Sequence, residues 1–147
     1  MSQYYELNGT TLWNPSNGAS RLFLNQVGFF EEELGVSSGI GPMESDACEV
    51  TPAVLEVFLA TVLAWRGRSG HAVVQALSDG FLATLLVIAE RAGVTMPPRA
   101  ALADRGTGRI RDAAQVRSSP LSVDGGESEW SATVRERARQ LDSFMAR

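Results

Sequence analysis

The fold is decided by the stretch Thr51–Gly93, TPAVLEVFLATVLAWRGRSGHAVVQALSDGFLATLLVIAERAG, which predicts two apolar helices joined by a short polar break. Thr51 supplies a capping hydroxyl, and Pro52 occupies the first helical position, where the missing N–H of proline costs nothing. The apolar residues that follow point to more than one side of the helix, because successive residues lie about 100° apart on the helical wheel. The first helix is therefore predicted to be buried on several sides.

The break at Arg66–Gly70 separates this helix from a second one, predicted from about Gly70 to Ala92 with Ser69 as its cap. Gly93 follows in the position of a left-handed C-cap, a conformation that glycine adopts without steric cost.

Neither helix is predicted to cross a membrane, because a span needs about 20 consecutive apolar residues. The break carries two arginines, and Asp79-Gly80 interrupts the second helix. The pair is instead predicted to be a core helical hairpin, with excess apolar surface available as a homodimer interface.

The N-terminal residues predict a β-hairpin. Asn8-Gly9 separates two short runs of aromatic and β-branched residues, Tyr4–Leu7 and Thr10–Trp13, and the tightest hairpin turns need positive φ at both central positions. An isolated hairpin is only marginally stable, so it is expected to pack on the helix pair. Asp46–Val50 is a candidate third strand beside it.

Another helix is predicted from Ser16 or Ser20 to Leu34, closed by Gly35. Its apolar stripe is Leu22, Phe23, Val27, Phe30 and Leu34. Its last turn is acidic: Glu31, Glu32 and Glu33. Acidic side chains at a helix C-terminus oppose the helix dipole, so they form either a solvated face or an interaction site for a basic partner.

The chain changes in character after Gly93. Residues 94–127 are rich in Gly, Ser and Arg and poor in apolar residues, so they are predicted to form a linker or a loosely held segment. Residues 128–147 predict an amphipathic helix whose apolar stripe includes Trp130, Val134 and Leu141. The predicted organisation is thus an α+β core domain over residues 1–93, mainly α, with a hairpin packed on an antiparallel helical core, followed by the linker and the C-terminal helix.

Composition limits the class of protein. The 147 residues suffice for one domain with a core, and the N-terminus lacks the basic and apolar segments of a signal peptide, so we expect a cytoplasmic protein. Residues 1–93 carry 4 arginines against 10 acidic residues, a net charge of −6, and the chain contains no lysine. Binding to nucleic acid is not expected of such an acidic domain, because phosphate contact needs clustered positive charge.

Trp13, Asn14 and Arg21 lie together at the corner between the hairpin and the helix that follows it, and they are the first candidates for a ligand site. The expected pocket lies between the hairpin, the Gly39–Pro42 loop and the start of the second core helix. The loop lacks the Gly-Lys-Ser/Thr ending of a phosphate-binding loop.

His71 and Asp79 are the polar residues of the second core helix that could complete this pocket. A rise of 1.5 Å per residue separates them by about 12 Å, too far for the carboxylate to orient the imidazole. A carboxylate inside an apolar helix needs a partner, which we expect to be Trp13, Arg21 or Asn14. Both residues are accordingly expected to be structural; the alternatives are a functional role for either residue or simple solvent exposure of Asp79.

Cys48 is the only cysteine, which excludes an internal disulfide. Its acidic neighbours Glu44, Asp46 and Glu49 should raise the pKa of the thiol, so Cys48 is not expected to be a nucleophile. The spacing of these acids does not match a calcium-binding loop. We therefore predict no catalytic residue, no cofactor and no metal.

Several strings together resemble a family of short, uncharacterised actinobacterial proteins. They are TLWNPS at 11–16, RLF at 21–23, SGIGPM at 38–43, GFLATLLV at 80–87 and RAG at 91–93. The resemblance covers residues 3–93 and not the tail, and it implies no activity. It agrees with the arginine-only composition and with a domain boundary near Gly93.

The leading functional hypothesis is a small cytoplasmic protein-interaction module, either antidote-like or a regulatory accessory subunit, that forms a homodimer. The alternative is a small ligand-binding protein or enzyme that uses the Trp13–Arg21 corner with His71 and Asp79.

Overall fold

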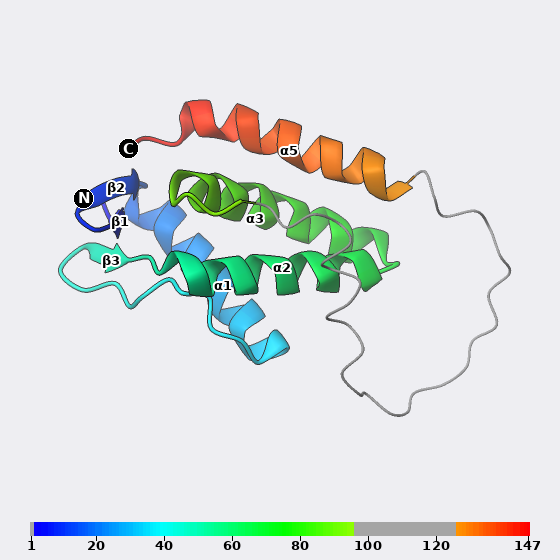
Figure 1. The fold of residues 1–147 in the computed structure, drawn as a ribbon, viewed down its shortest axis with the longest axis horizontal. Coiled ribbons are helices and arrows are strands. Elements are labelled where there is room, and N and C mark those ends of the chain that lie inside the picture. The colour runs from blue at the N-terminus through cyan, green and yellow to red at the C-terminus, as the bar shows by residue number, and fades with distance from the viewer. Residues whose placement is uncertain (1, 96–125) are drawn as a thin grey trace, which may run out of the picture.

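The structure is a computed structural model, which describes the backbone of residues 2–95 and 126–147 and the side chains of these residues except 126–131. Within these residues the chain is mainly α, with a small three-stranded mixed sheet near the N-terminus and four helices (Figure 1). The predicted fold class is confirmed. The predicted linker lies almost entirely outside the described residues.

The sheet lies at one end of the helical layer and has the order β2-β1-β3 (Figure 1). β1 (Tyr4–Leu7) and β2 (Thr10–Trp13) form the predicted antiparallel hairpin, and β3 (Ala47–Glu49) is the predicted third strand, parallel to β1. The turn residues Asn8 and Gly9 have φ of 51° and 77°, as the Asn-Gly pattern requires. The Asn8 N–H donates to Glu49 Oε1 over 2.7 Å, which ties the hairpin turn to β3.

The helix pair is α2 (Pro52–Arg68) and α3 (Ala72–Arg91), antiparallel as predicted (Figure 1). Ser69 ends α2, and His71 occupies the N-cap of α3, so the prediction that Ser69 caps the second helix is wrong. α3 also continues through Asp79-Gly80, because Asp79 is paired with a residue of α2. Gly93 has φ of 76°, in the left-handed region expected of it.

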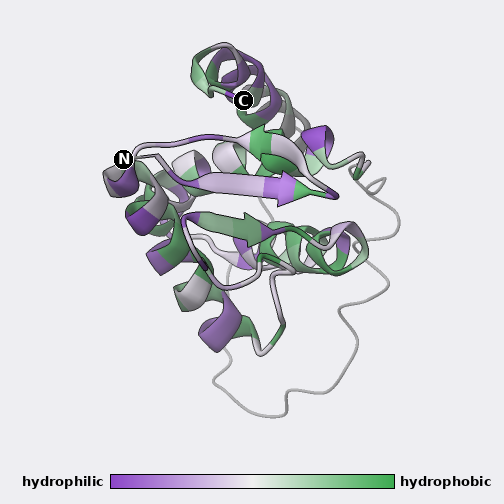
Figure 2. Cartoon of the chain, turned by 90° about the vertical axis from the view of Figure 1, so that its left-hand side faces the viewer, coloured by the Kyte–Doolittle hydropathy of each residue, from purple (hydrophilic) through white to green (hydrophobic). Residues whose placement is uncertain are grey.

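Helix α1 (Asn17–Leu34) crosses the α2–α3 pair steeply, as the two perpendicular views show (Figures 1 and 2). It begins at Ser16, whose hydroxyl accepts from the Ala19 N–H, and ends at Gly35 with φ of 64°. Its buried side chains join an aromatic cluster with the hairpin and α3, made of Tyr5, Trp13, Phe23, Phe30 and Phe81. Leu22 was predicted in the apolar stripe, but it points to solvent.

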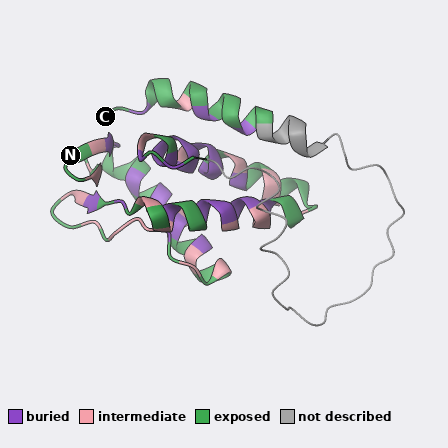
Figure 3. Ribbon diagram, in the orientation of Figure 1, coloured by how far each residue is buried: buried purple, intermediate pink, exposed green. Residues whose placement is uncertain are grey.

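Helix α5 (Gly126–Phe144) lies along α3, and both helices end beside the sheet (Figure 1). Val134, Ala138 and Met145 are buried in the common core, while the remaining α5 side chains from 132 on are partly or fully exposed (Figure 3). By length and composition alone α3 is the one described helix that could cross a membrane, with half of the relevant window buried. Its packing between α2 and α5 accounts for that apolar character within the fold.

Candidate functional site

The residues of the predicted corner have separate roles. Trp13 is a core residue, with its ring centroid 5.0 Å from that of Tyr5 and 5.4 Å from that of Phe23. The Asn14 backbone N–H donates to the Ala146 carbonyl over 2.9 Å, so this residue supports the C-terminal segment. Arg21 is exposed on α1. Of the three residues, Trp13 therefore belongs to the core, the Asn14 side-chain oxygen Oδ1 is buried without a hydrogen-bond partner among the described residues, and Arg21 is exposed.

His71 lies far from this corner. The hairpin contacts the last turn of α3, where Arg91 bonds the Leu12 carbonyl, whereas His71 precedes the first turn of the same 20-residue helix. A helix of this length spans about 30 Å. The predicted pocket between the hairpin, the Gly39–Pro42 loop and the start of this helix is therefore wrong, because the opposite end of the helix meets the sheet.

Asp79 has the structural polar contact that was predicted, but with a different partner. Arg66 Nε donates to Asp79 Oδ1 over 3.0 Å, and the two side chains are 8% and 25% exposed. The pair joins α2 to α3 near the break. It gives the Asp79 carboxylate the polar partner that a charged group in an apolar helix needs. The structure shows Arg66 as the partner in place of the expected Trp13, Asn14 or Arg21.

A shallow depression of about 390 Å³ lies beside Arg21. It is lined by Gln3, Asn17, Gly18, Arg21, Leu24 and Asn25. Arg21 is its only charged group, and neither His71 nor Asp79 reaches it, so the described lining offers no acid–base pair for catalysis.

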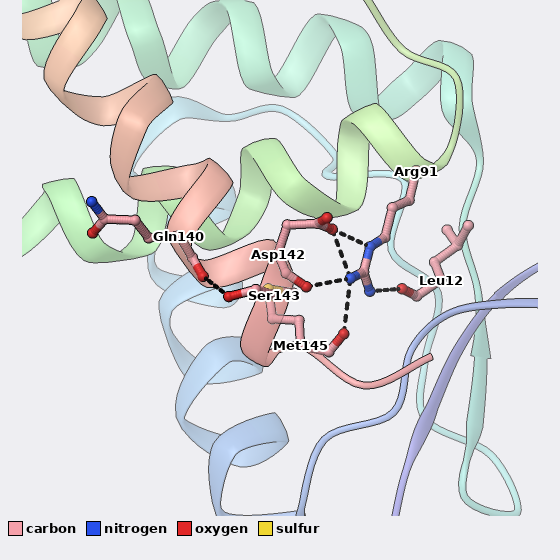
Figure 4. Close-up of polar contacts among 6 residues, drawn as sticks. All are labelled: Leu12, Arg91, Gln140, Asp142, Ser143 and Met145. Atoms are coloured by element: carbon pink, nitrogen blue, oxygen red, sulfur yellow. Dashed lines mark hydrogen bonds and ion pairs between the residues drawn. The ribbon is translucent and has the colours of Figure 1, made fainter.

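Arg91 makes a polar cluster that the sequence did not reveal (Figure 4). Its guanidinium donates to the carbonyl oxygens of Leu12, Asp142 and Met145 and pairs with the Asp142 carboxylate, with NH2 to Oδ1 at 2.7 Å. The side chain is only 7% exposed. We call Arg91 and these three partners the Arg91 clasp. It joins β2, the end of α3 and the end of α5, and it supplies donors to carbonyls that a helix C-terminus leaves unpaired.

The glycine-rich loop also has a structural explanation. Gly39 has φ of +73°, and a Cβ there would lie 2.8 Å from the Leu55 nitrogen and the Thr51 oxygen. The Glu31 carboxylate accepts from the Ser38 N–H at 2.7 Å and from its hydroxyl at 2.6 Å. Glu31 therefore fixes the loop on α1. Of the three predicted interaction acids, Glu32 and Glu33 remain exposed.

Cys48 is buried against the sheet. Burial, with smaller contributions from the charges of Glu49 and Glu6, raises the pKa of its thiol to about 12. A thiol with this pKa is almost fully protonated at neutral pH, as expected for a structural cysteine. Across residues 2–95 and the described part of α5, no three His, Cys, Asp or Glu side chains cluster as metal ligands.

The solvent side of α1 carries two exposed apolar side chains. Leu22 and Phe29 are 65% and 54% exposed, and seven residues are close to two helical turns, so they lie on one face. Arg21, Asn25 and Glu32 are exposed on the same side of the helix. We call Gly18, Arg21, Leu22, Asn25, Gly28, Phe29 and Glu32 the α1 outer face.

The remaining interaction candidates lie on α5. Val134 is buried against the core and Leu141 is half-buried, so both serve the docking of α5 on its own chain. The side chain of Trp130 lies outside the described residues.

Comparison with known proteins identifies a family but no activity. No curated protein matches the chain, and no solved structure matches it. One family model matches residues 1–147, including the tail that the resemblance in residues 3–93 left out. The chain therefore belongs to DUF6086, a family of unknown function.

Proposed function

We propose that this protein is a small protein-interaction module, antidote-like or a regulatory accessory subunit, that binds its partner through the α1 outer face. The observation that carries the proposal is the exposure of Leu22 and Phe29 on one side of α1. Scattered exposed apolar residues are ordinary, but a leucine and a phenylalanine lie here two turns apart on one helix face, one on each side of Asn25, and we call these two side chains the apolar strip. Aromatic side chains are also enriched at the centres of protein interfaces.

The charges around this strip suit a protein partner. Arg21 lies before Leu22, and Glu32 lies after Phe29, so the strip has a cation at one end and an anion at the other. Opposite charges at the rim of an apolar patch fix the orientation of a partner and exclude partners of the wrong charge order.

Two glycines make the α1 outer face unusually accessible to another helix. Nothing lies within 4 Å of the Cβ that Gly18 or Gly28 would carry. A glycine inside a helix costs about 1 kcal/mol relative to alanine. Gly28 has no packing role among the described residues that would offset this cost, whereas a bare backbone permits close approach of a partner helix.

Other exposed apolar residues support a binding face less well. Val73 and Leu77 are exposed at the start of α3, but they lie at the same end of the molecule as residues 126–131 (Figure 1), whose side chains are not described. Phe144 stands alone at the end of α5.

The alternative, an enzyme or ligand-binding protein at the Trp13–Arg21 corner, has weaker support. His71 precedes the first turn of α3, whereas the hairpin meets its last turn, and Arg66 already pairs with Asp79. An acid–base mechanism needs its groups within hydrogen-bond reach of one substrate.

A cytoplasmic location and an actinobacterial source belong to the same proposal. The arginine-only basic composition supports the proposed source.

The test is a photo-cross-linking residue at Asn25, in the middle of the α1 outer face, in the full chain expressed in its native host. Ala53, exposed on α2, provides the matched control position. We expect a discrete adduct from position 25 and none from position 53.

The mass of the adduct separates the outcomes. An adduct with any other polypeptide chain, a second copy included, supports the proposal. Cross-linking only within one chain, at unchanged mass, would mean that the protein covers this face itself, and the proposal would be overturned. The same holds if position 25 gives no adduct or if both positions give the same adducts.

A further inference from the structure

We propose that the partner of the α1 outer face is a second copy of this chain, with the two α1 helices packed antiparallel across a two-fold axis. This inference rests on the proposed function, and it specifies which partner the face binds. It follows from the order of apolar and charged residues along one face of α1.

The apolar pair is self-complementary. In an antiparallel two-fold contact, residue i of one helix faces residue j of the other when both lie at equal distances from the axis. Leu22 and Phe29 are equidistant from position 25.5, halfway between 22 and 29. An axis at that point places Leu22 of each copy on Phe29 of the other and covers all four exposed side chains at once.

The charged pair, considered by itself, gives nearly the same position for the two-fold axis. Arg21 and Glu32 are equidistant from position 26.5, halfway between 21 and 32. The two midpoints differ by one residue, so an axis at 25.5 leaves Arg21 and Glu32 offset by two residues, about 3 Å along the helix, which these long side chains can accommodate. The antiparallel arrangement therefore forms two opposite-charge pairs, Arg21 of each copy with Glu32 of the other.

Other arrangements of two copies are worse. A parallel contact would place Arg21 beside Arg21 and Glu32 beside Glu32, and like charges at an interface oppose association. Gly18 and Gly28, with open space around them, allow the antiparallel backbones to approach closely.

The dimer is expected to be weak. A contact made by one face of an 18-residue helix falls below the roughly 1,200 Å² of a standard stable interface. We expect a dissociation constant on the order of 10 µM.

The test is sedimentation equilibrium of the full chain at concentrations from about 5 to about 500 µM, which bracket the expected constant. The wild type should shift from its monomer mass of 15.8 kDa to twice that mass. Arg21→Glu alone and Glu32→Arg alone should each weaken association at least ~10-fold, because each creates two like-charge contacts across the axis.

An equimolar mixture of the two single variants gives the decisive result. One chain then carries Arg21→Glu and the other carries Glu32→Arg, so an acidic and a basic side chain face each other again in both cross-axis pairs. Association at or near the wild-type strength is expected only in the mixture. Arg68→Glu and Glu56→Arg, both exposed on α2, change the net charge equally and should leave association unchanged.

Three results would overturn the inference: a wild type that remains monomeric at all concentrations, single variants that associate as the wild type does, or a mixture that stays monomeric. A monomeric wild type combined with an Asn25 adduct to a different protein would leave the proposed function standing with another partner. An absence of both self-association and adducts would reject both.

Discussion

Helices α3 and α1 differ in how completely the rest of the chain covers them. α3 is the more apolar of the two, but α2, α5 and β2 enclose it, and all but one of the residues from Phe81 to Ala89 are buried. α1 buries one stripe and leaves Leu22 and Phe29 in solvent. The sequence pointed to the α2–α3 pair as the source of a subunit interface because its apolar residues are dense. A subunit interface depends on which apolar residues remain exposed to solvent. On α3 the C-terminal helix covers much of the apolar surface.

The largest effect on the free energy of unfolding is expected from a substitution that weakens the contact between α3 and α5. Arg91→Met removes the donors to three carbonyls and leaves the Asp142 carboxylate without its cation. The three carbonyls lose a charged donor, whereas the half-exposed Asp142 carboxylate can be solvated by water, so the expected cost of roughly 3–4 kcal/mol comes mostly from the carbonyls. Denaturant unfolding should show this loss in the free energy of unfolding.

The matched control for Arg91 is Arg139→Met on α5, where the side chain is 70% exposed and pairs with Glu136. It should change the free energy of unfolding by less than about 0.5 kcal/mol. Equal effects of the two substitutions would show that the Arg91 clasp does not hold α5 in place.

A smaller effect is expected at the other buried arginine. Arg66→Met removes one partner of the Arg66–Asp79 pair and should destabilise the protein by about 2–3 kcal/mol, because Asp79 remains in an apolar helix. Asp79→Leu in the same chain removes the carboxylate that Arg66 pairs with. The double variant should therefore be more stable than Arg66→Met alone in a double-mutant cycle; additive losses would contradict a direct pair.

The stability of the protein at alkaline pH tests the burial of Cys48 and Tyr5 in the sheet. The pKa of Cys48 rises from an ordinary 9.0 to about 12, mainly by burial. The pKa of Tyr5 rises from 10.0 to about 12, again mainly by burial, although its Ser20 hydrogen bond opposes the shift. Both groups bind protons more tightly in the folded state, so their contribution to stability is complete below about pH 9 and is lost as the pH rises toward 12.

The free energy of unfolding of the wild type should therefore begin to fall near pH 9. In Cys48→Ala the decline should begin only near pH 10, where unfolded Tyr5 titrates. Identical pH profiles for the two proteins would mean that the Cys48 thiol is not protected by folding.

Local signals explain which parts of this structure could be predicted from the sequence. Asn8-Gly9 predicted the hairpin and Thr51-Pro52 the start of α2, because each signal acts within a few residues. The Arg91 clasp could not be predicted, since its acceptors are mostly backbone carbonyls 51 to 79 residues away, and every residue type has such a carbonyl. The same limit explains the error over His71: the pattern predicted α3 but not which of its ends meets the sheet.

The smallest effect on stability is expected on the open side of α1. Leu22→Gln with Phe29→Gln changes two side chains that are mostly exposed, so the free energy of unfolding of the monomer should change by less than about 0.5 kcal/mol. A large loss of stability in the monomer would mean that these residues belong to the core, as the apolar stripe first suggested for Leu22.

The association of this same double variant shows whether the α1 outer face is the binding surface. Its self-association and its Asn25 cross-links should both be measured beside those of the wild type. If the α1 outer face is the binding surface, both should be lost while the fold stays intact. If the folded double variant associates and cross-links as the wild type does, the α1 outer face is not the binding surface, because a binding surface cannot keep its affinity after its apolar strip has become polar.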